Sequence, residues 1–248
     1  MGVVPRWLIL LADWSNIVAG LILCVAFGLV CAFSVFKVVE FPDVAEAINQ
    51  TFFWEGVFWA IAAICLTCRN IIEENAYGAV SQTIIAFGGL FFTVSGLGGN
   101  PAAVISYKYI IPYENHVKLA DAAPFYGITC FMFATAMGLY SVWPLPKKLA
   151  VGPFWGVACF FIGAWLIGLF GFWGPCLAGG GEDYPKVETP DDPPYWLSMP
   201  SNTAWTHVVQ FIGALFLTEG GIIFGMLDGI CATGSGGEDS EDSDFIDG

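Results

Sequence analysis

Six long apolar stretches, separated by polar segments, are the feature that most restricts how this chain can fold. Each is close to the ~20 residues with which an α-helix crosses a bilayer. The stretches cover residues 7–36, 52–68, 79–97, 125–143, 154–175 and 205–231. Because 56% of the residues are hydrophobic and only 12% are charged, a water-soluble globule would expose more apolar surface than such proteins tolerate. We therefore predict an all-α, polytopic membrane protein with six transmembrane helices.

Nearly all of the 248 residues lie in or between the six predicted spans, which predicts one membrane domain over residues 1–233 and an acidic, disordered tail over residues 234–248. There is no room for a separate catalytic domain. The sequence contains no phosphate-binding loop, nucleophile elbow or metal-binding helix motif. Two histidines, His116 in a loop and His207 at a span end, cannot supply paired haem ligands. We predict no enzyme activity, no cofactor and no metal.

The charge of the chain bears on its partners and its orientation. A net charge of −14 gives no electrostatic reason to bind nucleic acid, so that partner is excluded. Four of the eight basic residues flank short connections on one side of the predicted membrane, namely Arg6, Arg69, Lys147 and Lys148. Because positive residues favour the cytosolic side, we expect an integral multi-pass protein with both termini in the cytosol.

Carboxylates within the spans are the strongest candidates for function. A charged group at a helix centre costs at least ~2.5 kcal/mol on insertion scales. Asp13 begins the first span and Glu55 begins the second. Glu219 sits in the middle of the sixth span and Asp228 lies near its end. We predict that Glu55, Glu219 and Asp228 couple a proton or an ion, and that Glu219 is not exposed to lipid.

Small and polar residues also form continuous faces on the first and last spans. At ~100° per residue, one stripe of the sixth span contains His207, Gln210, Ala214, Thr218, Gly221, Gly225 and Asp228. A lipid-facing stripe would be rich in Leu, Ile and Phe, so this face is expected to meet protein or water. Small residues at four-residue spacing let helices approach closely. The residues predicted to pack the first span on the sixth are Gly20, Gly221, Gly225 and Gly229.

The second and third spans carry a family resemblance. Residues 69–70 read Arg-Asn, residues 74–79 read Glu-Asn-Ala-Tyr-Gly-Ala, and residues 87–92 read Phe-Gly-Gly-Leu-Phe-Phe. This pattern resembles the acetate uptake transporter family, whose six-helix members join their second and third helices by an Asn-Thr-Phe-Gly-Ala-like turn. A Tyr/Phe-Gly-Gly-Phe-Trp-like run follows that turn. Asn75, Tyr77, Gly78 and Ala79 match the turn, and Phe87, Gly88 and Gly89 match the run.

The resemblance implies transport of acetate and related small carboxylates, often linked to protons, by a homo-oligomer in the lipid bilayer in which each subunit has its own path. By position, Phe27 and Phe87 are the aromatic residues that would narrow this path. Hydrogen-bonding side chains beside aromatic rings are also what a carboxylate that sheds its water needs. The predicted path residues are Asn16, Phe27, Asn75, Tyr77, Ser81, Phe87, Gln210 and Thr218.

A second interpretation requires no path. A membrane scaffold, or an accessory subunit of a larger complex, would also have glycine-rich helices, long loops and a 16% aromatic content. The two interpretations differ in what the helices enclose. A polar cavity reached by water favours transport, whereas a dry, close-packed bundle favours the scaffold.

Overall fold

The computed structural model describes residues 3–98, 113–141, 152–174 and 205–229. These residues form α1 (Arg6–Ser34), α2 (Phe41–Ile72), α3 (Ala76–Gly98), α5 (Tyr113–Ser141), α6 (Gly152–Trp165), η1 (Leu166–Trp173) and α8 (Thr206–Leu227). The described part of the chain contains no strand, and six of its helical segments are long and apolar enough to cross a membrane. The predicted all-α, six-span class is confirmed. The predicted tail over residues 234–248 lies outside the described residues.

Two helices begin well before the spans that the sequence predicts. Helix α2 begins at Phe41 rather than at residue 52, with a proline in its first turn and Asp43 beside its N-terminus. Proline and aspartate both favour the start of a helix, but neither raises the hydropathy of the segment. A search for apolar stretches therefore places the start of this helix too late. Helix α5 begins at Tyr113 rather than at residue 125 and contains Pro124 in its interior. Proline removes one backbone hydrogen bond and typically kinks a helix without ending it.

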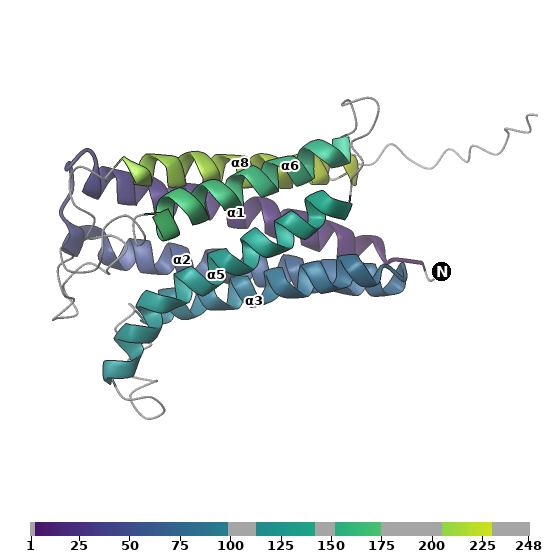
Figure 1. Cartoon of the computed structure of the whole chain (residues 1–248), viewed down its shortest axis with the longest axis horizontal. Helices are drawn as coiled ribbons and strands as arrows, with labels where there is room; N and C mark the ends of the chain where they lie inside the picture. The colour runs from purple at the N-terminus through teal and green to yellow at the C-terminus, as the bar shows by residue number, and fades with distance from the viewer. Residues whose placement is uncertain (1–2, 99–112, 142–151, 175–204, 230–248) are drawn as a thin grey trace, which may run out of the picture.

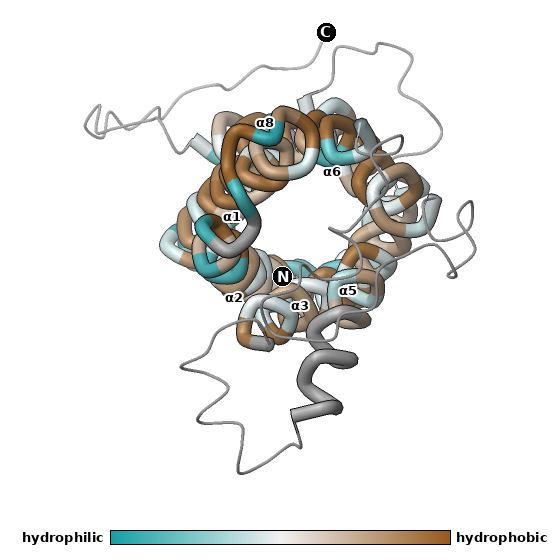
Figure 2. Tube along the Cα trace, turned by 90° about the vertical axis from the view of Figure 1, so that its left-hand side faces the viewer, coloured by the Kyte–Doolittle hydropathy of each residue, from teal (hydrophilic) through white to brown (hydrophobic). Residues whose placement is uncertain are grey.

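The helices are arranged as a closed ring. Each spanning segment packs against the next one in chain order, and α8 packs against α1 to close the circle. Figure 2 shows this ring end on, while Figure 1 shows the same helices side by side along the long axis of the protein. The outer faces carry exposed apolar side chains, among them Trp14, Leu21, Val80, Leu90 and Leu215. Such a surface suits the lipid interior, so the protein is an integral, multi-pass membrane protein.

Glycines set the close contacts between neighbouring helices. A Cβ on Gly89 of α3 would lie 2.7 Å from the backbone nitrogen of Ala60 and 2.8 Å from the carbonyl oxygen of Gly56. At the contact between α1 and α8, a Cβ on Gly20 of α1 would lie 2.8 Å from the Cα of Thr218 on α8. Only residues without a side chain allow backbones to approach this closely. The two contacts hold α2 to α3 and α1 to α8.

The fifth span changes its winding halfway along. Helix α6 passes directly into η1, a π-helix of eight residues. Its Gly168 lies against Met132 of α5, and its Gly171 lies against Gln210 of α8. The indole Nε1 of Trp173 donates a hydrogen bond of 3.0 Å to Thr129 of α5. The wider π-helix, a form that often occurs at functional sites, therefore connects α5 and α8 at this end of the ring.

Candidate functional site

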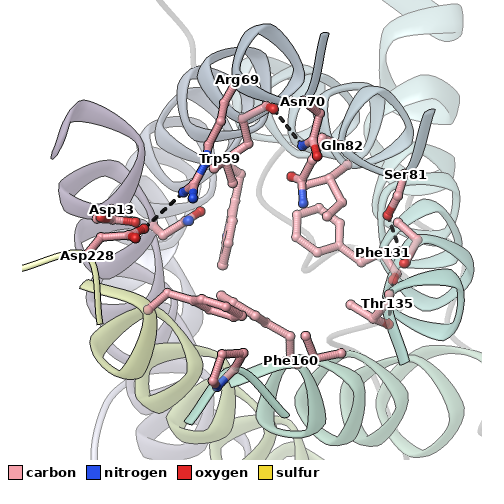
Figure 3. Close-up of a pocket in the computed structure, with 18 of the residues that line it drawn as sticks. Asp13, Trp59, Arg69, Asn70, Ser81, Gln82, Phe131, Thr135, Phe160 and Asp228 are labelled. Carbon is pink, nitrogen blue, oxygen red and sulfur yellow. Dashed lines mark hydrogen bonds and ion pairs between the residues drawn. The ribbon is translucent and has the colours of Figure 1, made fainter. Parts of the chain in front are cut away.

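A cavity of about 380 Å³ lies inside the ring, and every spanning helix contributes to its wall. This volume falls within the ~300–1,000 Å³ of small-molecule sites. The cavity reaches the end of the bundle where α2 and α8 end. Its principal side chains, most of them labelled in Figure 3, are Asp13, Asn16, Trp59, Arg69, Asn70, Glu73, Ser81, Gln82, Phe131, Thr135, Phe160, Phe224 and Asp228.

A network of charged side chains forms the wall of the cavity at α1, α2 and α8. Nε of Arg69 donates to Glu73 at 3.0 Å, and its Nη1 donates to Asp228 at 3.1 Å. Figure 3 shows Arg69 pointing toward Asp228 with Asp13 beside it. The three carboxylates and one guanidinium sum to a formal charge of −2. We call Asp13, Arg69, Glu73 and Asp228 the charged wall.

Asp13 differs from the other two carboxylates of the charged wall. Its side chain is only 2% exposed, although it lines the cavity. Its Oδ2 atom has no hydrogen bond to the described residues. Glu73 and Asp228, in contrast, are each bonded to Arg69 and partly open to solvent. A buried carboxylate with one unpartnered oxygen is costly to keep in a fold that does not use it.

Neutral polar groups form the opposite wall, on α3 and α5. Ser81 donates a hydrogen bond of 3.0 Å to the carbonyl oxygen of Ala134, which ties α3 to α5. Thr135 donates to the carbonyl oxygen of Phe131 at 2.7 Å. Gln82 directs its amide toward the centre of the cavity in Figure 3. This wall offers amide hydrogens and hydroxyl oxygens to a small polar solute.

Aromatic rings from four helices form the apolar part of the cavity wall. Trp59 stands edge-on to Phe131 at a centroid distance of 5.1 Å and to Phe160 at 6.0 Å. Phe160 stacks on Phe224 at 5.8 Å. We call Trp59, Phe131, Phe160 and Phe224 the aromatic floor. These edge-on and stacked pairs make this part of the cavity wall apolar.

A second aromatic layer lies behind the floor. Phe92 contacts Phe131 at 5.9 Å and stacks on Phe52 at 6.3 Å, and Phe52 contacts Phe27 edge-on at 5.8 Å. Phe27, Phe52 and Phe92 lie about two to three helical turns further from the cavity mouth than the lining residues of α1, α2 and α3. Phe27, predicted to narrow the path, is completely buried in this layer. It does not line the cavity itself.

Two predicted site residues face away from the interior, which corrects the sequence analysis. Glu219 is exposed on the outer stripe of α8, together with Leu215 and Ile222. The expectation that it avoids the lipid-facing surface is wrong for the single chain. Phe87 is 55% exposed on the outer side of α3, so it does not narrow this cavity. Its neighbour Gly88 packs on the ring of Phe131 and makes room for that residue in the floor.

The turn on which the family resemblance rests has a structural role here. The side-chain oxygen of Asn75 accepts a hydrogen bond from the backbone nitrogen of Gly78 at 3.0 Å, and its Nδ2 donates to Asn70 at 2.8 Å. Asn75 therefore caps the N-terminus of α3. Asn75 and Tyr77 are exposed and do not line the cavity. The structure therefore does not support the prediction that these two residues lie on the substrate path. Asn70, which Asn75 holds, does line it.

We expect Asn75→Ala to lower the free energy of unfolding by about 1 kcal/mol, because an N-cap side chain is lost. Thermal unfolding of the purified protein in detergent would measure this loss. Thr83→Ala on the exposed side of α3 is the matched control, since Thr83 bonds only within its own helix. Equal stability of the two variants would argue against the capping role.

The remaining predicted residues are buried between helices, away from the cavity. The side-chain oxygen of Gln210 accepts a hydrogen bond of 2.6 Å from Nδ1 of His207. The hydroxyl of Thr218 donates to the carbonyl oxygen of Ala214 at 2.9 Å. Glu55 is 1% exposed, and its Oε2 has no hydrogen bond within the described chain. Asp228 alone of the three predicted coupling residues lines the cavity, whereas Asn16 and Ser81 do so among the predicted path residues.

The predicted packing glycines have different environments. Gly20 lies against Thr218, and Gly221 lies at ordinary contact distance from Asn16. Gly225 is buried in α8. Gly229 has a φ of 75° directly after the helix. A glycine in this conformation ends a helix, so Gly229 terminates α8 and does not pack it on another helix.

Sequence reasoning missed part of the site. In the sequence, Arg69 bears only on orientation and on the family resemblance, and Asp13 is not among the predicted coupling residues. The signal for Asp13 was present, because it is an acid in the second turn of a strongly apolar helix. Trp59 and Phe131 carried no such signal, since aromatic residues occur on every face of these helices.

No group of three or more His, Cys, Asp or Glu that could hold a metal ion occurs in the described ranges. Comparisons with protein-family models, with curated proteins and with solved structures found no match for this chain. The functional interpretation therefore depends on the cavity itself.

Proposed function

We propose that this membrane protein transports a small polar solute through the centre of its ring. The observation that carries the proposal is a cavity of about 380 Å³ enclosed by all six spanning helices and lined in part by the aromatic floor. A polar chamber in line with an apolar barrier is how selective paths admit a solute and restrict its passage. A scaffold needs neither the chamber nor a buried carboxylate in its wall.

Acetate and related small carboxylates are the substrates that the sequence resemblance suggests. Arg69 and the amides of Asn16 and Gln82 offer hydrogen-bond donors to a carboxylate. The three carboxylates of the charged wall would repel the same anion. We therefore propose that the anion enters together with a proton, which offsets the negative charge. This coupling agrees with the proton-linked transport that the resemblance implies.

A homo-oligomer forms the second part of the proposal. The cavity is lined by one chain, so each subunit would have its own path. Glu219 lies exposed in the middle of α8, where contact with lipid is costly and contact with a second subunit would cover it. The size of the detergent-solubilised protein tests this part.

Reconstitution into liposomes tests transport. The solutes are radiolabelled acetate, neutral acetamide and cationic methylammonium, with the flux through protein-free vesicles subtracted because acetic acid itself crosses lipid. We expect acetate to be taken up, and we expect Gly138→Leu to reduce that uptake roughly tenfold by filling the cavity. A Cβ on Gly138 would meet only Val157, at 3.6 Å, so the backbone has room for this change.

Gly28→Leu is the matched control, because a Cβ there has only one contact, at 3.9 Å, and Gly28 does not line the cavity. We expect its flux to equal that of the unmodified protein. If methylammonium or acetamide is taken up but acetate is not, the protein has a transport path, but the proposal that its substrate is a carboxylate is wrong. No flux of any of the three solutes would favour the scaffold.

A further inference from the structure

We propose that Asp13 is the proton-binding residue of the cavity and that Oδ2 is the atom that receives the proton. The inference rests on the proposed function for its coupling role. Three observations place the site: Asp13 lines the cavity, it is only 2% exposed, and its Oδ2 lacks any hydrogen bond to the described residues. Asp13 is the eighth residue of α1, about 10 Å along the helix from its start.

The surroundings distinguish Asp13 from the other acids. Within the described chain, three other charged groups share the cavity wall with Asp13. Arg69 lies in the last turn of α2, Glu73 directly follows α2, and Asp228 directly follows α8. Nε and Nη1 of Arg69 are already bonded to Glu73 and Asp228. Asp13 therefore faces a second carboxylate and a guanidinium with two other partners. Two close carboxylates around one cation favour the uptake of one proton.

A proton fits this site better than a metal ion does. Divalent cations need several oxygen ligands at once. The described residues hold no group of three or more His, Cys, Asp or Glu that could bind a metal ion. One proton satisfies one oxygen. The O–H bond forms between Oδ2 and a proton from water in the cavity, which turns the carboxylate into a neutral carboxyl group. The same bond breaks when the proton returns to water, and no other bond changes.

The proton also explains how an anion could enter an acidic chamber. With Asp13 protonated, the formal charge of the charged wall changes from −2 to −1. The repulsion of an incoming carboxylate falls accordingly, and the new O–H group can donate a hydrogen bond to it. Loss of the proton restores the repulsion and favours release of the anion. Asp13 thereby links proton occupancy to solute occupancy.

The first measurement is acetate flux in liposomes with equal pH on both sides, at several pH values. For the unmodified protein, we expect flux to rise as pH falls, by up to about tenfold per pH unit where the site is mostly empty. Asp13→Asn, which resembles the protonated side chain, should transport with no such dependence. Glu46→Gln is the matched control, because Glu46 is an exposed carboxylate of α2 that does not line the cavity, so this variant should keep the full pH dependence.

The second measurement needs no transport. Infrared difference spectra of the protein in detergent, recorded between high and low pH, should show the carbonyl band of a protonated carboxyl group that is absent from Asp13→Asn. If Asp13→Asn fails to fold, Asp228→Asn takes its place: it removes the neighbouring carboxylate and should move the midpoint of the flux profile and of the infrared band to lower pH.

The two measurements separate this inference from the proposed function. Full pH dependence in Asp13→Asn, or an unchanged band, would overturn the proton site and leave transport standing. A midpoint that does not move in Asp228→Asn would overturn it equally. An Asp13 band without any solute flux would retain the proton site and reject transport.

Discussion

Phe131→Ala should open the aromatic floor and allow larger carboxylates, such as butyrate, to cross at rates near that of acetate. Phe131 contacts both Trp59 and Phe92, at 5.1 and 5.9 Å between ring centroids, so it joins the floor to the layer behind it. Without this ring, the cavity would extend toward Phe92. We also expect a loss of stability of ~3–5 kcal/mol from the new void, so flux must be measured per folded protein.

Phe133→Ala is the control for this variant. Phe133 lies on the same helix, two residues away, and is 66% exposed on the outer surface. We expect acetate flux and substrate range to be unchanged by it. If Phe131→Ala folds and still excludes butyrate, the floor does not determine which solutes pass.

Gly89→Leu should prevent assembly of the ring. A Cβ at this position would already meet backbone atoms of Gly56 and Ala60 at 2.7–2.8 Å, and backbone cannot rotate away as a side chain can. Helices α2 and α3 would have to separate, which breaks the contact between two neighbouring spans. We expect little or no monodisperse protein in size-exclusion chromatography.

Gly28→Leu again provides the comparison, because it adds the same side chain where the space is open. Gly89→Ala gives an intermediate test, since one methyl group would force a smaller separation. Normal yield and a normal elution profile for Gly89→Leu would mean that α2 and α3 do not pack as closely as described.

The six spans could be predicted from the sequence because apolar length is a property of each segment alone. Which way a residue faces could be predicted only in part. Glu219 and Asp228 are nine residues apart, which places them on opposite sides of an α-helix at ~100° per residue. Both could therefore not have faced one cavity, and only Asp228 does. The sequence shows that the two side chains point to opposite sides of the helix. Which of the two sides faces the cavity depends on the order of the helices in the ring.

The same reasoning applies to α3. Phe87 lies five residues after Gln82, about 140° away around the helix, so the predicted gate and the polar wall could not share a face. The role of Asn75 could not be predicted from the sequence either, because an asparagine that caps a helix and one that binds a ligand look alike in a sequence. The floor depended on contacts between α2, α5, α6 and α8, which no single segment encodes.

The contact between α1 and α8 has a consequence for how the protein is made. Among the six spanning helices, α1 is synthesised before the others and α8 after them, so the contact between α1 and α8 is the last of the ring to form. Until α8 arrives, the face of α1 that carries Asp13, Asn16 and Gly20 lacks the helix that covers it in the finished protein. Polar groups on such a face are poorly soluble in lipid. An intermediate that still lacks α8 must therefore stay with the insertion machinery, or with a second chain, until α8 enters the membrane.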